Sequence, residues 1–172
     1  MLFVFSFICF LTSFFLNKTI GKPTIQRVEA TGGEVAIRTE TPNTVLRFDI
    51  SQQLLPNSWS YLYITLEDTQ REELCAFSEE LWAEAGIDQG YHWSESKNTF
   101  TNKFSFSKPG VYYLVIEPEV PAVAPEKIGE IKIKSQELRG SNVPHLSMAI
   151  ISLLLAIVLN EIANLTLIRL IF

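Results

Sequence analysis

The sequence predicts a mainly β protein: an antiparallel β-sandwich of the jelly-roll or Ig-like type, with an N-terminal apolar segment and a C-terminal transmembrane helix. Two observations support this prediction. Apolar residues gather at both ends of the 172-residue chain, and the middle contains six or more short candidate strands separated by turn signals. We therefore divide the chain into a signal peptide or signal anchor (1–21), a β-sandwich (22–136), a linker (137–143) and a transmembrane helix (144–169).

The distribution of charge limits the class of protein. Nearly all charged side chains lie between the two apolar ends, and the net charge is −5. A basic nucleic-acid binder would carry an excess of lysine and arginine, and a disordered chain would have fewer apolar residues. This layout also excludes an ordinary soluble enzyme. The sequence indicates one small domain held at a membrane, with no nucleic-acid partner.

The N-terminal segment fits two different fates. Residues 1–16 include 13 hydrophobic residues and no charge. A secretory signal usually has basic residues before its apolar core and small residues at the cleavage point. Here the first basic residue, Lys18, follows the core, and Thr19-Ile20-Gly21 is a passable cleavage site. A cleaved signal and a retained anchor both remain open.

The C-terminal segment is the clearer membrane candidate. Leu146–Leu159 has no charge, and continuation to Ile168 gives 23 residues, which exceeds the ~20 residues that a membrane-spanning helix needs. Asn160, Glu161 and Asn164 share one broad helix face. These three residues either form a polar seam that pairs with another helix, or belong to an interfacial tail after a short span.

The flanking charges leave the side of the membrane open. Basic residues follow the first apolar segment and precede the last one, so they lie on the domain side of both. The positive-inside tendency would place the domain in the cytoplasm. A cleaved signal peptide would instead place it outside the cytoplasm. The basic residues are Lys18, Lys22, Arg27, Lys127, Lys132, Lys134 and Arg139.

Several runs in the middle alternate as half-buried strands do. Residues 46–50 and 100–106 are the clearest, and residues 35–37 and 131–133 are shorter examples. Trp59–Leu66 and Val111–Ile116 are apolar on both faces, which predicts central strands covered on both sides. Turn signals separate the runs at residues 31–33, 41–43, 56–57 and 108–110.

Arg71–Ala85 is ambiguous. It places Leu74, Phe77, Leu81 and Trp82 at near-helical spacing and contains no glycine or proline, so propensity alone favours a helix. A helix packed on the sandwich and a long acidic strand are both open from the residues alone.

Two motifs carry a family resemblance. A Gly-aromatic-x-Trp-Ser-Glu element precedes a strand of the form Pro-Gly-x-Tyr-x-Leu-x-Ile-Glu-Pro. With them, Trp59–Glu119, about a third of the chain, resembles the C-terminal β domain of bacterial membrane-associated proteins of unknown function. Some of those proteins carry an upstream zinc ribbon, which this sequence lacks. The matching residues are Gly90, Trp93, Ser94, Glu95, Pro109, Gly110, Tyr112, Leu114, Ile116, Glu117 and Pro118.

The resemblance implies a fold and a membrane setting. In those relatives the acidic stretch is a strand, which favours a strand for Arg71–Ala85 as well. The resemblance supplies no catalytic residues.

No catalytic or cofactor motif is present. Cys9 lies in the apolar leader, so Cys75 is the only cysteine of the domain, which excludes an internal disulfide or a cysteine-based zinc site. His92 has Asp88 and Ser94 nearby, but side chains so close in sequence rarely reach triad geometry. We expect a non-enzymatic protein with no cofactor, and we expect His92 in a loop.

An acidic stretch and a set of aromatic residues are the candidate binding features. Residues 67–95 contain nine carboxylates and a single Lys or Arg residue, Arg71. Carboxylates can bind calcium, form solvated surfaces, or meet a basic partner. Trp59, Trp82 and Trp93, together with Tyr61, Tyr63 and Tyr91, would form a sugar-stacking platform if exposed, although aromatic residues of small domains more often form the core.

These features predict a membrane-anchored, non-enzymatic β-sandwich that acts as a protein-interaction or scaffolding module. The alternative is a module at the membrane surface that binds carbohydrate or calcium. The partner-binding candidates are Glu79, Glu80, Glu84, Trp93 and Glu95, and the helix-pairing candidates are Asn160, Glu161 and Asn164.

Overall fold

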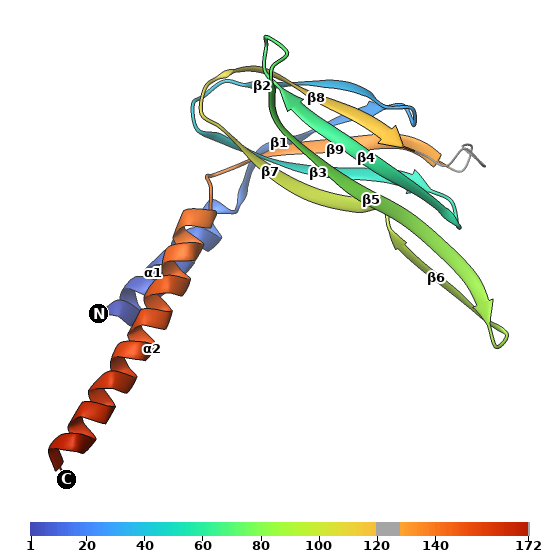
Figure 1. Cartoon of the computed structure of the whole chain (residues 1–172). Coiled ribbons are helices and arrows are strands. Elements are labelled where there is room, and N and C mark those ends of the chain that lie inside the picture. The colour runs from blue at the N-terminus through green and yellow to red at the C-terminus, as the bar shows by residue number, and fades with distance from the viewer. Residues whose placement is uncertain (120–127, 172) are drawn as a thin grey trace. The chain divides into compact units, whose positions relative to one another are not determined.

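The chain forms two compact units, which are described separately below. The computed structural model describes residues 1–119 and 128–171, and of residues 163–171 it describes only the backbone. One unit comprises Met1–Ile20 and Leu138–Phe172, and the other comprises Gly21–Glu137. The first is helical and the second is built from strands (Figure 1).

The β unit contains two antiparallel sheets that form a sandwich-like arrangement. The four-stranded sheet has the order β1-β9-β3-β7, and the five-stranded sheet has the order β2-β8-β4-β5-β6 (Figure 1). The strands are β1 (Thr19–Val28), β2 (Gly33–Thr39), β3 (Thr44–Leu54), β4 (Ser58–Glu67), β5 (Glu73–Asp88), β6 (Tyr91–Lys97), β7 (Thr99–Phe106), β8 (Gly110–Glu119) and β9 (Ile128–Leu138).

The core lies between the two sheets, and period-two alternation supplies it. Alternate side chains of a strand point to opposite faces, so a strand that packs on the core sends every second residue inward. In β3, Phe48 and Ile50 are fully buried, and in β4 the same is true of Leu62 and Ile64. The Phe48 ring packs against that of Phe104 in β7, with 5.6 Å between the ring centroids.

The predicted burial of β4 on both faces is wrong. The inward positions of β4 are buried, but Trp59, Tyr61 and Tyr63 on its other face are 39%, 38% and 45% exposed. β4 and β8 are indeed interior strands of their sheet. Apolar residues on both faces predicted a covering layer, whereas the structure exposes the second row of β4 as a surface.

The acidic stretch is a strand rather than a helix. β5 spans Glu73–Asp88 and pairs with β4 along most of its length. Leu81 and Ala83 are buried, whereas Glu80 and Glu84 on the alternate positions are exposed. Pairing with β4 provides hydrogen-bond partners for the backbone of β5. This tertiary contact outweighs the helical propensity of the stretch. His92, expected in a loop, lies in β6 opposite Ile87.

An arginine anchors the turn between β4 and β5. Arg71 occupies left-handed backbone at φ 66°. Its guanidinium donates hydrogen bonds of 2.5 and 3.0 Å to the two carboxylate oxygens of Glu34, and a third of 3.2 Å to Glu67. It also lies 3.8 Å from the ring centroid of Tyr113 in β8. These contacts raise the pKa of Arg71, mainly through the hydrogen bond to Glu34.

The helical unit pairs the two apolar ends of the chain. It contains α1 (Leu2–Leu16) and α2 (Val143–Ile171). Over Val143–Ile162, α2 is long and apolar enough to span a membrane, whereas α1 is shorter than a typical span. The Ser6 hydroxyl of α1 donates a 2.7 Å hydrogen bond to the carbonyl of Ala149 in α2.

Small side chains lie in the contact between the two helices. The buried residues are Ser6, Cys9 and Ser13 in α1, and Ala149, Ser152 and Ala156 in α2. Small residues let helix backbones approach closely, which is a typical feature of helix pairs in membranes. Asn160 and Glu161 are exposed beyond this contact, and the side chain of Asn164 lies outside the described residues.

Candidate functional site

The exposed face of the five-stranded sheet carries the candidate site. Trp59, Tyr61 and Tyr63 occupy alternate positions of β4 and therefore share one face. In the register between β4 and β5, Trp59 lies opposite Trp82, and Tyr61 lies opposite Glu80. Residues directly opposite each other in an antiparallel pair are in contact on the same face. The aromatic row of β4 is thus bordered by a mixed aromatic and acidic row of β5.

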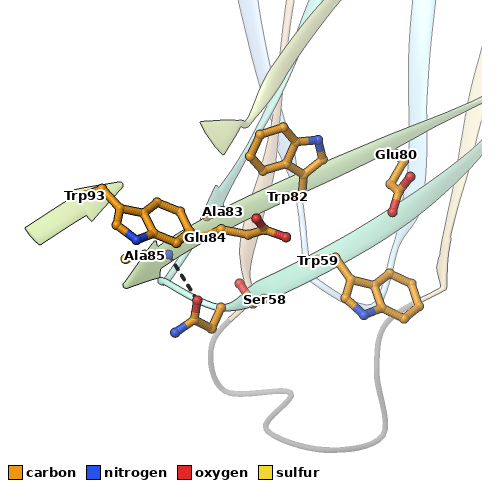
Figure 2. A pocket seen from close by; sticks show the side chains of 9 residues that line it. Ser58, Trp59, Glu80, Trp82, Ala83, Glu84, Ala85 and Trp93 are labelled. Carbon is orange, nitrogen blue, oxygen red and sulfur yellow. Dashed lines mark hydrogen bonds between the residues drawn. The ribbon is translucent and has the colours of Figure 1, made fainter. Parts of the chain in front are cut away.

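At one end of this face is a hollow that we call the tryptophan groove. Its volume is about 520 Å³, and all three tryptophans of the chain line it. Figure 2 shows Trp93 and Trp59 apart, with the Glu84 carboxylate between them and Trp82 nearby. The full lining comprises Asn57, Ser58, Trp59, Glu80, Trp82, Ala83, Glu84, Ala85 and Trp93.

A tight turn before β4 forms one wall of the groove. Asn57 has φ 59°, a left-handed conformation that asparagine tolerates better than most residues. Its side-chain oxygen accepts a 3.0 Å hydrogen bond from the backbone N–H of Ala85 in β5 (Figure 2). The Ser58 hydroxyl donates to the carbonyl of Leu55, closing the turn from the other side. The first of these bonds ties the turn to the strand that carries Glu84, and the second holds the turn itself together.

A glycine in β5 provides the surface on which Trp93 lies. Gly86 is directly opposite Trp93 in the β5–β6 pairing. A Cβ atom at Gly86 would lie 2.8 Å from Cε2 and Cζ2 and 2.9 Å from Nε1 of the Trp93 indole. The indole therefore lies flat against bare backbone, where only glycine leaves room. Trp93 remains 43% exposed on its other side.

The strand register separates the acidic candidates into two groups. Glu80 and Glu84 line the groove, and Glu95 of β6 lies opposite Glu84 on the same face. Glu79 points to the other face of β5 and forms an ion pair with Lys97. Within the described part of the chain, no ion pair involves Glu80, Glu84 or Glu95. Lys97 lies opposite Trp82 in the β5–β6 pairing, but it is paired with Glu79, so the three carboxylates leave this face with a negative charge.

The remaining chemical candidates do not converge. Across the described residues, no group of three or more His, Cys, Asp and Glu side chains is placed to hold a metal ion. No hydrogen bond among those residues joins His92 to Asp88, Ser94 or Glu95. Cys75 is half-buried, and burial, followed by the charge of Glu73, raises the pKa of its thiol. Calcium binding by the acidic stretch therefore lacks a geometric basis in the described residues.

Two contributors to the groove were not identified from the sequence. The sequence predicts only a turn at Asn57, and nothing in it marks Gly86 as the position under Trp93. The Pro56-Asn57 pair is the only sequence signal for Asn57. The role of Gly86 depends on the β5–β6 register, which the sequence does not reveal.

No protein-family model matches this chain, and no curated protein is significantly similar to it.

Proposed function

We propose that this protein is a non-enzymatic binding module that is anchored in a membrane and docks its partner through the exposed face of β4, β5 and β6. The observation that carries the proposal is the convergence of Trp59, Trp82, Trp93, Glu80 and Glu84 at one groove. Exposed aromatic surface costs free energy in water, roughly 25 cal/mol per Å² of apolar area. Contiguous patches of this kind mark interaction sites more often than isolated exposed side chains do.

A protein is the first candidate partner. Among the described residues, neither Glu80 nor Glu84 forms an ion pair, because the nearby Lys97 is paired with Glu79, so lysine or arginine side chains of a partner would complement them. Pull-down of the full chain from solubilised membranes tests this. We expect partner proteins that are recovered with the wild type to be lost with Glu80→Lys/Glu84→Lys and kept with the control Glu40→Lys/Glu73→Lys. Equal recovery with both double variants would contradict docking at the groove.

A carbohydrate is the second candidate, and one specific observation favours it. The structure brings all three tryptophans, two carboxylates and an asparagine amide to one open hollow. Aromatic faces beside hydrogen-bonding side chains are the combination that a sugar ring requires.

We further propose that α1 is retained and forms a membrane hairpin with α2. The support is the hydrogen bond from Ser6 to Ala149, the 3.4 Å hydrogen bond from the Ser13 hydroxyl to the carbonyl of Asn142, and the small residues buried between the helices. Cleavage of a signal peptide after Gly21 would remove α1 and expose this surface of α2. Retention also agrees with the basic residues on the domain side, which favour a cytoplasmic domain.

Thiol labelling tests the side of the membrane. Asn98 is exposed between β6 and β7, so a cysteine there is accessible to reagents. We expect Asn98→Cys, in protein with Cys9→Ser and Cys75→Ser, to be protected from an impermeant thiol reagent in intact cells and labelled after lysis. Labelling in intact cells would contradict the cytoplasmic placement.

The strand order supports a jelly roll as the type of sandwich. When β6 is set aside as an addition to β5, the eight remaining strands form two four-stranded sheets with the orders β1-β9-β3-β7 and β2-β8-β4-β5. We propose that this is two interleaved Greek keys, as in double-sheet jelly rolls. β6 then extends one edge and supplies Trp93 to the groove.

A further inference from the structure

We infer that the tryptophan groove binds a chain of uncharged sugar residues. This inference rests on the proposed function, since it names the ligand of the face through which the module docks. It depends on four properties of the groove: its aromatic surfaces, its hydrogen-bonding groups, its length and its charge.

The aromatic surfaces suit the faces of pyranose rings. A pyranose presents C–H groups on its broad faces, and these pack on the electron-rich face of an indole. Trp59 and Trp93 are 39% and 43% exposed, so each offers surface to a ligand. Trp82 is half-buried and lies opposite Trp59 in the β4–β5 pairing. It therefore extends the aromatic surface that Trp59 offers.

The polar groups beside the tryptophans suit the hydroxyl edges of the same rings. Glu80 and Glu84 offer carboxylate oxygens, which accept hydrogen bonds from sugar hydroxyls. The side-chain oxygen of Asn57 is occupied by the Ala85 N–H, so its NH₂ group keeps two donors for hydroxyl oxygens. The groove thus offers both donors and acceptors.

The spacing of the surfaces fits a chain of sugars better than a single ring. Along β5, Trp82 is followed by Glu84 and then by Gly86, which carries the Trp93 indole. Four residues of extended strand span about 13 Å. A ligand that contacts both indoles must therefore extend along β5, with the Glu84 carboxylate facing its middle.

The charge of the groove selects against anionic sugars. Glu80, Glu84 and Glu95 lie on the same face of β5 and β6, and the nearby Lys97 is paired with Glu79. A uronate or phosphorylated sugar would meet this field and lose affinity, especially at low salt. Neutral hexoses and N-acetylated hexosamines carry no such penalty.

Intrinsic fluorescence provides a direct test because every tryptophan of the chain lines the groove. The full chain is purified in a detergent without a sugar head group. It is then titrated with hexasaccharides of β-1,4-linked glucose, mannose and N-acetylglucosamine, with polygalacturonate, and with polylysine. We expect a saturable change in tryptophan emission with at least one of the three neutral hexasaccharides and a much weaker response to polygalacturonate.

Three single variants connect the response to the groove. We expect Trp59→Ala and Trp93→Ala each to raise the dissociation constant by about tenfold, which corresponds to ~1.4 kcal/mol. Tyr91→Ala is the matched control, because Tyr91 is an exposed aromatic of the same hairpin that does not line the groove. Its affinity should remain within about twofold of the wild type. Thermal unfolding of each variant establishes that it is folded.

The possible outcomes separate this inference from the proposed function. No response to any neutral hexasaccharide would overturn it, as would tight binding of polygalacturonate. A response to polylysine alone, abolished by Glu80→Lys/Glu84→Lys, would overturn it while leaving this face as a docking site for a basic protein. No response to any of the probes, together with pull-downs unaffected by that double variant, would overturn both.

Discussion

Substitution of Gly86 by alanine tests whether backbone under Trp93 positions its indole. An alanine Cβ would lie 2.8 Å from two indole carbons, and ordinary contact begins at 3.4 Å, so the indole must move by about 0.6 Å to restore ordinary contact. Overpacking in a core costs ~1–3 kcal/mol, but Trp93 is 43% exposed and can move outward. Alanine also stabilises a strand by ~0.5–1 kcal/mol relative to glycine. We therefore expect the free energy of unfolding to change by less than about 1 kcal/mol.

The displacement of the indole should nevertheless be visible by fluorescence. In protein with Trp59→Phe and Trp82→Phe, Trp93 is the only tryptophan, and Gly86→Ala should shift its emission to longer wavelength and increase its quenching by acrylamide. Gly110→Ala is the matched control, because its nearest neighbour, the Tyr112 ring, is at an ordinary 3.8 Å. Identical emission and quenching before and after Gly86→Ala would refute the proposed contact.

Three further predictions concern the core, the pH dependence and the helices. Phe48→Ala removes a fully buried ring and should lower the free energy of unfolding by about 3–5 kcal/mol in denaturant titrations, and a loss under ~1 kcal/mol would contradict its central place. The hydrogen bond from Arg47 holds the pKa of Asp49 below its usual range, so the stability that this carboxylate contributes is present above its unfolded pKa of about 4 and is lost as the pH falls through its folded pKa. Asp49→Asn should therefore make Tm fall less steeply as the pH is lowered. An equally steep fall would contradict the contribution of the Asp49 carboxylate. Cysteines in place of Ser6 and Ala149, in protein without the two native cysteines, should cross-link within one chain on mild oxidation, whereas absence of the cross-link would contradict a retained α1.

The strands that form the core were predictable because their inward positions alternate clearly. Residues 46–50 and 100–106 are paired strands with the expected faces inward. Two strands were not predicted. β1 contains Gly21 and Pro23 and is exposed over most of its length, and every residue of β6 is exposed, so neither has a buried face to produce alternation.

The residues of β4 alone could not show whether a second layer covers its outer face. Trp59, Tyr61 and Tyr63 are apolar enough for a buried face, but burial requires a second layer over them. The acidic stretch shows the same dependence on tertiary structure. Its helical spacing is genuine, yet pairing with β4 makes it a strand.

The candidate site was predictable in composition but not in arrangement. The tryptophans were recognisable as a possible stacking platform, and Glu80, Glu84 and Trp93 were already candidates for partner binding. Their convergence depends on two registers, Trp59 with Trp82 and Gly86 with Trp93. Glu79 illustrates the difference, because one position along β5 moves a carboxylate to the opposite face.

The most direct test of the central claim is hydroxyl-radical footprinting of the tryptophan groove in native membranes and in purified protein. If the groove docks a partner, oxidation of Trp59 and Trp93 should be strongly reduced in native membranes relative to the purified chain. Tyr91, which is 79% exposed and outside the groove, provides the internal reference and should be oxidised similarly in both. Equal oxidation of the two tryptophans in both samples would contradict the account.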